Sequence, residues 1–507
     1  MNNNINDNTN KTINKNILLV YPKYTETFWS FEHILKIIGK KAPFPPLGLL
    51  SISGMLPASW EKKLIDMNVE NLNDKDIEWS DYVFISAMIV QKESTLKVIE
   101  KIKKFGKPIV AGGPLFTTGW EEFQYVDHIF LGESEETLPE FIKDVEKGQV
   151  KKIYSSNEYP DINKTPTPEW SLINIFKYNS MCIQYSRGCP FNCEFCDVVV
   201  LNGRIPRIKT KQQIIKELDT LYNYNWRGGI FFVDDNLIGN KKNLKNDILP
   251  AIIQWQKKRN YPFTFNTQAS INLVDDEELI NLMVDAGFTT VFIGIETPDP
   301  QGLEECSKFH NKNRDLVSSV KKLQNSGLEV QGGFIVGFDS DTPSIFQRQI
   351  EFIQKSGIVT AMVGLLTALP KTRLYKRLME SKRILKESSA NNTLTSTMNF
   401  IPKMDAKLLF SGYKKITETI YSPKAYYERI KTFIREFKPQ KRRKRRLQRV
   451  KLFHFKVLFS SFWLLGLKNS GRRYFWKLML WSLFKYPGLF PYVIGYSIAG
   501  VHFRKIA

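Results

Sequence analysis

Short apolar runs alternate with helical patterns along most of this 507-residue chain, and that alternation limits the folds available to it. Strands separated by helical segments predict parallel, doubly wound sheets that carry helices on their faces. The alternation comes in two blocks, and a chain of this length is expected to hold two or three domains. We therefore predict two α/β domains, at about residues 17–150 and 181–375, joined by a proline-containing linker over residues 151–180.

The first block predicts a Rossmann-like sheet of five strands. Its apolar runs cover residues 16–21, 63–66, 82–86, 108–114 and 128–133. Ligands of such sheets bind at the carboxyl ends of the strands. Glycine at those ends lets the backbone approach a ligand closely, although Gly-Pro is also ordinary turn chemistry. The residues at these ends are Ser86, Gly112, Gly113, Pro114, Gly132 and Glu133.

The second block predicts six strand–helix units, which suit a partial (β/α)6 barrel. Its apolar runs cover residues 182–185, 229–236, 263–268, 290–296, 329–338 and 361–366. In barrels of parallel strands the chemistry lies where the strands end. Residues at those ends also have structural uses, because Asp234 could cap a helix and Gly337 could simply turn the chain. The residues at these strand ends are Asp234, Asp235, Gln268, Glu296, Gly333, Ile335 and Gly337.

Three cysteines, Cys189, Cys193 and Cys196, follow the first strand of the second block with the spacing Cys-x3-Cys-x2-Cys. Three thiolates on one loop can hold three irons of a [4Fe–4S] cube, whose full ligation takes four cysteines. The fourth iron is then open, as in catalytic metal sites. Structural zinc is the alternative, with Cys182, Cys306 or a histidine as a fourth ligand. Otherwise Cys182 and Cys306 are interpreted as inert buried thiols.

The cysteine loop follows Arg187-Gly188, and the loop and the polar strand ends together resemble the radical S-adenosylmethionine (SAM) enzymes. In that family SAM occupies the open iron, and an electron from the cluster cleaves SAM to a 5′-deoxyadenosyl radical. The resemblance implies that the three loop cysteines bind the cluster. It also implies roles for the strand ends: Asp234 and Asp235 near SAM's amino group, Gln268 and Glu296 near SAM or substrate, and Gly333, Ile335 and Gly337 beside the adenine. This sequence departs from the family at two positions. It has Val-Asp-Asp-Asn at residues 233–236 where the family commonly has Gly-Gly-Glu, and Ser340 where a Glu often follows the Gly-x-Ile-x-Gly element.

A Rossmann-like domain directly before such a core is similar to the cobalamin (B12)-binding class of radical SAM proteins. The resemblance implies that the first block's strand ends, from Ser86 to Glu133, contact cobalamin. The usual Asp-x-His-x-x-Gly motif, whose His ligates cobalt from below, is missing, because neither His33 nor His128 lies in one. The chain looks most like the branch that includes hopanoid C-2 methylases, whose B12-type domain also lacks this histidine motif.

That branch implies the chemistry that we expect. SAM would remethylate cobalamin and would also supply the radical that removes hydrogen from an unactivated carbon of a lipid-like substrate. The electron would come from a donor such as flavodoxin or ferredoxin. Two rivals are a radical SAM enzyme that forms a C–C bond or ring in a lipid and a tRNA-modifying methylthiotransferase. An iron–sulfur sensor or scaffold is the non-enzymatic alternative. A tRNA methylthiotransferase is disfavoured, because that family needs three N-terminal cysteines and no cysteine precedes Cys182.

The last seventy residues carry most of the net charge of +22. Residues 438–507 contain 17 Lys and Arg and no Asp or Glu, and aromatic residues follow a basic run at 438–449. Basic and aromatic residues together suit interfacial helices on anionic lipid. A packed helical cap and RNA binding are the alternatives, and nucleic acid is the less favoured partner. The stretch 486–503 is a borderline spanning candidate, because it is uncharged but interrupted by proline.

These patterns complete the expected organisation. Residues 1–16 are predicted to be a disordered leader, residues 376–437 a helical extension, and residues 438–507 a basic aromatic tail. Without a signal peptide, the compartment is expected to be reducing. We expect a cytoplasmic protein that lies peripherally at the inner face of the cell membrane.

Overall fold

The computed structural model describes residues 14–385, 398–439, 462–468 and 471–506. The chain forms two compact units, one of residues 1–23 and 46–173, the other of residues 24–45 and 174–507. The predicted boundaries differ from this division in two places. Residues 24–45 were expected in the first domain but belong to the second unit, and residues 151–173 belong to the first unit instead of forming a linker. Most of the predicted leader, the basic run 441–449 and the aromatic residues up to 459 lie outside the described residues.

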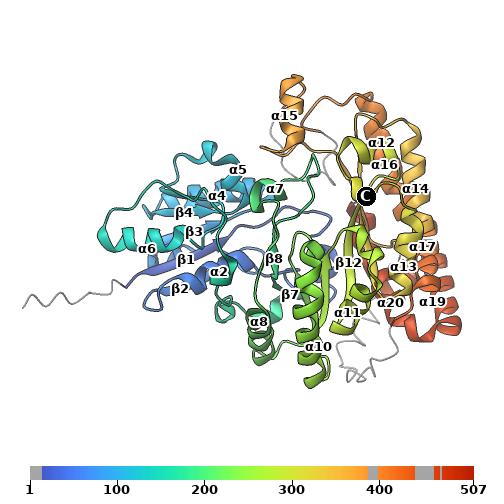
Figure 1. Cartoon of the computed structure of the whole chain (residues 1–507), viewed down its shortest axis with the longest axis horizontal. Helices are drawn as coiled ribbons and strands as arrows, with labels where there is room; N and C mark the ends of the chain where they lie inside the picture. The colour runs from blue at the N-terminus through green and yellow to red at the C-terminus, as the bar shows by residue number, and fades with distance from the viewer. Residues whose placement is uncertain (1–13, 386–397, 440–461, 469–470, 507) are drawn as a thin grey trace, which may run out of the picture. The chain divides into compact units, whose positions relative to one another are not determined.

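The first unit contains a six-stranded parallel sheet in the order β2-β1-β3-β4-β5-β6 (Figure 1). All five predicted strands are present, and a sixth short strand follows them. The strand order reverses between β1 and β3, which is the point where open α/β sheets bind ligands. The strands are β1 (Asn16–Tyr21), β2 (Glu61–Asp66), β3 (Tyr82–Ser86), β4 (Ile109–Gly112), β5 (His128–Leu131) and β6 (Ile153–Ser155).

Helices connect these strands and bury their faces. Leu18, Val20, Val83, Ile85 and Ile109 form part of one continuous core, as expected for parallel strands that are covered on both sides. The helices are α2 (Leu47–Met55), α3 (Asp74–Trp79), α4 (Lys92–Lys103), α5 (Pro114–Gly119) and α6 (Thr137–Lys147).

The second unit contains another six-stranded parallel sheet, in the order β14-β13-β12-β11-β10-β7, which confirms the predicted six-unit core. The strands are β7 (Ser180–Ile183), β10 (Gly229–Phe232), β11 (Thr264–Gln268), β12 (Phe288–Glu296), β13 (Glu329–Val336) and β14 (Ala361–Leu365). A small antiparallel pair, β8 (Ser186–Arg187) with β9 (Arg207–Ile208), encloses the cysteine loop.

Helices of the second unit run beside its sheet, and several begin at a side-chain cap (Figure 1). Thr210, Asp276, Asp315 and Thr372 each accept a hydrogen bond from a backbone N–H of the first turn. The helices are α1 (Glu32–Leu35), α7 (Val198–Asn202), α8 (Lys211–Asn223), α9 (Lys241–Asn243), α10 (Leu249–Lys258), α11 (Glu277–Ala286), α12 (Pro300–Glu305), α13 (Leu316–Asn325), α14 (Ser344–Ser356), α15 (Arg373–Glu380), α16 (Ala406–Tyr421) and α17 (Pro423–Glu436).

The described part of the basic tail forms a helical layer on the second unit. It consists of η10 (Phe462–Lys468), α19 (Arg472–Lys485) and α20 (Phe490–Ile506). The Phe503 ring of α20 stacks on Phe28 at 4.8 Å, and His502 Nε2 lies 3.0 Å from the Phe28 carbonyl oxygen. In the described residues, no helix combines the length and apolar character needed to cross a bilayer.

Candidate active site

The cysteine loop begins at a glycine that no other residue could replace without strain. Gly188 has φ +98°, and a Cβ there would lie 3.0 Å from the carbonyl oxygens of Asn202 and Ile205. Its N–H donates to Asp235 Oδ2 at 2.9 Å, and Cys189 N–H donates to the Gly203 carbonyl at 3.2 Å. The backbone is therefore fixed immediately before the first cysteine.

Cys189, Cys193 and Cys196 are partly buried free thiols. Burial raises the pKa of each thiol, and the three are close enough to influence one another electrostatically. Three sulfur donors on one loop fit a [4Fe–4S] cube that keeps one iron open. The other two cysteines are buried, Cys182 in β7 and Cys306 after α12, where its thiol lies 3.6 Å from the Leu303 carbonyl oxygen.

The end of β10 supports this loop. Asp234 is fully buried and accepts hydrogen bonds from Tyr185 N–H at 3.2 Å, Ser186 Oγ at 2.6 Å and Ser186 N–H. Burial raises the pKa of Asp234 to about 7. Its contact with SAM's amino group stays a prediction, since both oxygens here hold the backbone that leads into the loop. Asp235 accepts from Gly188 and from Asn202 Nδ2 at 2.9 Å, also within the loop.

Asn236 is a site residue that the sequence analysis did not single out. Its Nδ2 lies 4.0 Å from Cys189 Sγ and 3.1 Å from Ser270 Oγ, and its Oδ1 accepts from Ser270 N–H at 3.1 Å. The residue is 3% exposed, so the amide is held in place beside the thiol. Its position directly after the two predicted aspartates was the available signal.

A buried ion pair lies at the end of β12. Glu296 has φ +65°, an unusual conformation for a residue other than glycine, and pairs with Lys308. The exposed fractions of the two side chains are 10% for Lys308 and 9% for Glu296. Burial by itself lowers the pKa of Lys308, but the interaction with Glu296 and Cys193 outweighs burial and raises that pKa. Lys308 was not predicted, because nothing local in its sequence marks it. Gln268, which was predicted, lies partly buried at the end of β11.

The predicted adenine element lies at the end of β13. Gly333 faces the Phe292 ring so closely that a Cβ would lie 2.8 Å from it. Gly337 has φ +106°, and its N–H donates to Asp341 Oδ2 at 2.7 Å. Ile335 remains partly exposed between them. The element thus has the glycine-dependent backbone that the sequence predicted, and its contact with adenine stays a prediction.

The predicted cobalamin residues meet at one edge of the first unit's sheet. Ser86 and Gly112 are paired in register at the ends of β3 and β4, and Pro114 begins α5. Gly113 has φ +90°, and a Cβ there would lie 2.8 Å from Ser86 Oγ. Gly132 has φ +82° with open space where a Cβ would be. These glycines leave backbone accessible at the carboxyl ends of β4 and β5, on the side of the switch point that β3 begins, which fits a large ligand.

His128, the histidine of the first unit, does not lie at that edge. Glu133, which follows Gly132, is partly buried. His128 begins β5, at the opposite end of the strand, and its Nδ1 lies 2.6 Å from the Lys151 carbonyl oxygen. His33 belongs to the second unit and pairs with Glu26, Nε2 to Oε1, at 2.8 Å. Among the described residues of this unit, no histidine lies at the carboxyl edge of the sheet, in agreement with the missing Asp-x-His-x-x-Gly motif.

Family models match each part of the chain. One described as the radical SAM superfamily matches residues 183–353, and one described as a B12 binding domain matches residues 38–142. A third, described as a domain of unknown function (DUF4070), matches residues 372–507. The B12-binding match covers β2 to β5 of the first sheet, and the radical SAM match covers β10 to β13 of the second.

Curated relatives match nearly the whole chain. An uncharacterized methyltransferase of Synechocystis sp. is 40% identical over 491 residues, which cover 96% of this chain and 91% of that protein. The hopanoid C-2 methylase of Rhodopseudomonas palustris is 32% identical, covering 93% and 90% respectively. Among solved structures, the cobalamin-dependent S-adenosylmethionine radical enzyme OxsB, with aqua-cobalamin and S-adenosylmethionine bound, has a TM-score of 0.64 at 16% identity, over 97% of this chain and 79% of that chain. At that identity the likeness shows the fold.

Proposed function

Because this chain belongs to the cobalamin-dependent radical SAM methylases, we propose that it methylates an unactivated carbon of a lipid-like substrate. As a member of that family it is a radical SAM C-methyltransferase that uses a [4Fe–4S] cluster, SAM and cobalamin. The lipid nature of the substrate is the proposed part. Its main support is the relationship to a methylase named for a hopanoid.

The residues near the cysteine loop have assignable tasks in this reaction. Cys189, Cys193 and Cys196 would hold the cluster, while Asp234 and Asp235 keep the loop in place through its backbone. When bound, the cofactors supply the electron that cleaves SAM and a carrier for the methyl group. The protein's own contribution is positioning, because a radical must meet its substrate before it meets any other partner.

The exposed face of the C-terminal helices supports a lipid-like substrate independently. On α19, Phe475, Leu478 and Met479 are buried, so the opposite side of the helix faces outward. Large apolar side chains stand on that outer side and on η10, with exposed fractions of 80% for Phe484 and 54% for Leu480. The full set is Trp463, Leu467, Tyr474, Trp476, Leu480, Leu483 and Phe484.

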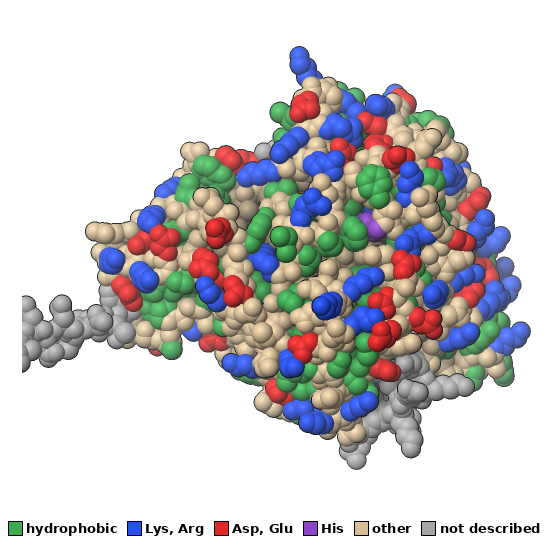
Figure 2. Space-filling model, viewed as in Figure 1, with side chains coloured by type: hydrophobic (Ala, Val, Ile, Leu, Met, Phe, Trp, Pro, Cys, Tyr) green, Lys and Arg blue, Asp and Glu red, His purple; other side chains and the backbone are tan. Residues whose placement is uncertain are grey.

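Cations surround these apolar side chains. Arg473 and Lys477 are exposed on the same side of α19 as Trp476 and Leu480, at the three- and four-residue spacing of one helix face. Figure 2 shows Lys and Arg side chains gathered along the right-hand edge of the molecule, where the C-terminal helices lie in Figure 1. Apolar and basic side chains on one exposed face are complementary to an anionic bilayer surface. We propose peripheral binding at the inner face of the cell membrane, with flavodoxin or ferredoxin as the electron donor.

The substrate proposal is tested with the anaerobically reconstituted full chain, reductant, cobalamin and SAM that carries an isotope-labelled methyl group. A total membrane-lipid extract and an aqueous metabolite extract are offered separately. We expect label in the lipid fraction and a product heavier by one methylene, with none formed by Cys193→Ala. Label only in the aqueous fraction would overturn the lipid substrate, and an unlabelled lipid that has lost hydrogens would favour bond or ring formation.

A further inference from the structure

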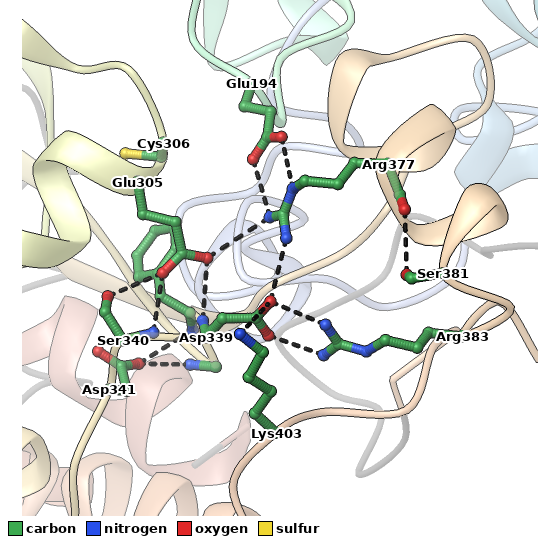
Figure 3. Close-up of polar contacts among 12 residues, drawn as sticks. Glu194, Glu305, Cys306, Asp339, Ser340, Asp341, Arg377, Ser381, Arg383 and Lys403 are labelled. Carbon is green, nitrogen blue, oxygen red and sulfur yellow. Dashed lines mark hydrogen bonds and ion pairs between the residues drawn. The ribbon is translucent and has the colours of Figure 1, made fainter.

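Glu194, which directly follows the second loop cysteine, is held by an arginine from the region that the DUF4070 model matches. Glu194 is 8% exposed and meets Arg377 of α15 in a two-pronged ion pair (Figure 3). Arg377 Nε lies 2.7 Å from Glu194 Oε1, and Nη2 lies 2.9 Å from Oε2. Paired hydrogen bonds of this kind fix orientation as well as distance.

The backbone of the loop is bound to the same helix. Leu374 N–H donates to the Glu194 carbonyl at 2.9 Å, and Arg373 Nη1 donates to the Asn192 carbonyl at 3.0 Å. On the other side, Glu194 N–H donates to the Cys306 carbonyl at 3.0 Å. Residues 192 and 194 are therefore held by α15 through main chain and side chain together.

Arg377 is itself held by acidic partners from α12 and from the turn after β13. Its Nη1 lies 3.0 Å from Asp339 Oδ2, and its Nη2 lies 3.5 Å from Glu305 Oε1. Asp339 also accepts two hydrogen bonds from Arg383, each of 2.7 Å. With Lys403 at 3.7 Å from Asp339, three acidic and three basic side chains form one partly buried network (Figure 3).

The network continues into the turn that follows the predicted adenine element. Glu305 Oε2 accepts from Ser340 N–H and from Ser340 Oγ, both at 2.8 Å, and Glu305 Oε1 accepts from Asp339 N–H at 2.9 Å. This turn begins two residues after Gly337. Ser340 stands where the family often has a glutamate, and here Glu305 brings a carboxylate to that position from α12.

We propose that Arg377 is a positioning residue, through which α15 of the C-terminal region holds the cluster loop and the turn after β13 in one fixed geometry. The Glu194 carboxylate lies between two cluster cysteines, and the partly exposed Arg377 guanidinium holds it by two hydrogen bonds, which restricts how far the loop can open. The role of the region that begins at residue 372 is then partly assigned, because it completes the cluster site. The inference rests on the family's cluster and is independent of the lipid substrate.

The test measures the cluster as well as turnover. Full-length wild type, Arg377→Gln, Arg377→Lys and Glu194→Gln are reconstituted anaerobically, and iron and sulfide are counted. The reduced proteins are then exposed to a ferrous-iron chelator, and the reduced-cluster EPR spectrum is recorded with and without SAM. We expect Arg377→Gln to lose iron about tenfold faster, the scale of one charge-assisted pair, and to show a changed SAM-dependent spectrum.

The controls separate positioning from general instability. Arg259→Gln breaks an ion pair with one hydrogen bond, Nη2 to Asp219 Oδ1 at 2.7 Å, in the same unit but away from the loop, and should lose iron at the wild-type rate. Arg377→Lys keeps the charge without the fork and should lie between wild type and Arg377→Gln. In the double variant Glu194→Gln/Arg377→Gln, the increase in the rate of iron loss should be smaller than the sum of the two single effects, expressed as free energies. Wild-type iron loss and spectra in both Arg377→Gln and Glu194→Gln would overturn the proposal, as would equal losses in Arg377→Gln and Arg259→Gln.

Discussion

At the scale of single residues, the site depends on a few polar groups that are held without freedom to move. Asn236 shares its amide between Cys189 and Ser270, and Lys308 is paired with Glu296 beside Cys193. Both lie near sulfur and both are buried, so their dipole or charge acts on the cysteines through little solvent. The potential of an iron–sulfur cluster responds to such hydrogen bonds and charges.

Asn236→Ala should make the cluster harder to reduce. The variant removes an N–H group that points toward Cys189 Sγ, and so removes stabilisation of the extra electron. A weak hydrogen bond of roughly 0.5–1 kcal/mol corresponds to about 20–40 mV for one electron. Potentiometric titration with EPR detection measures the change, and Asn272→Ala, which removes another partner of Ser270, is the control. A higher or unchanged potential in Asn236→Ala would contradict this assignment.

At the scale of elements, the C-terminal helices have a buried face and an exposed face that differ in composition. The buried faces of α19 and α20 pack within the second unit, as the Phe28–Phe503 stack shows. Deleting residues 438–507 would therefore uncover a hydrophobic core as well as remove the basic face. The membrane proposal is better tested by substitutions on the exposed side of α19, which leave the packing intact.

Leu480→Ser with Phe484→Ser should weaken binding to anionic vesicles by at least about tenfold. Burial of each side chain in the lipid would contribute roughly 1.5–3 kcal/mol to the free energy of binding. Co-sedimentation with vesicles of neutral lipid, and with vesicles that contain an anionic lipid, measures the effect. Leu408→Ser, at an exposed leucine of α16, is the matched control. If the double variant and wild type bound anionic vesicles equally, α19 would not be part of the proposed membrane-binding surface.

At the scale of the whole molecule, two parallel sheets with separate cores carry the two cofactor regions. The first unit carries Gly112, Gly113 and Gly132 at the carboxyl ends of β4 and β5, and the second unit carries the cysteine loop. Each unit has its own buried strands, so a local change in one is expected to leave the other folded. Loading of cobalamin and loading of the cluster should then be separable.

Gly113→Val should abolish cobalamin binding while iron binding is retained. Its side chain would collide with Ser86 Oγ and the Ala87 carbonyl at a φ that disfavours a β-branched residue. The cobalamin absorption spectrum and the iron content of one reconstituted sample give both readouts. Gly48→Ala, where a Cβ meets nothing within 4 Å, should bind both cofactors normally. Parallel loss of iron and cobalamin in Gly113→Val would show that the two units do not load independently.

The sequence alone determined the features that depend on neighbouring residues. Strand-like runs, the spacing of Cys189, Cys193 and Cys196, and glycines such as Gly113 and Gly337 are local patterns, and both sheets and their polar ends follow from them. Only the tertiary structure decided which distant segments meet. Glu194 and Arg377 are 183 residues apart, Lys308 reaches Glu296 from beyond α12, and residues 24–45 leave the first sheet to join the second unit. The periodicity of the sequence does not identify such partners, because they are selected by packing and charge pairing between remote segments of the folded chain.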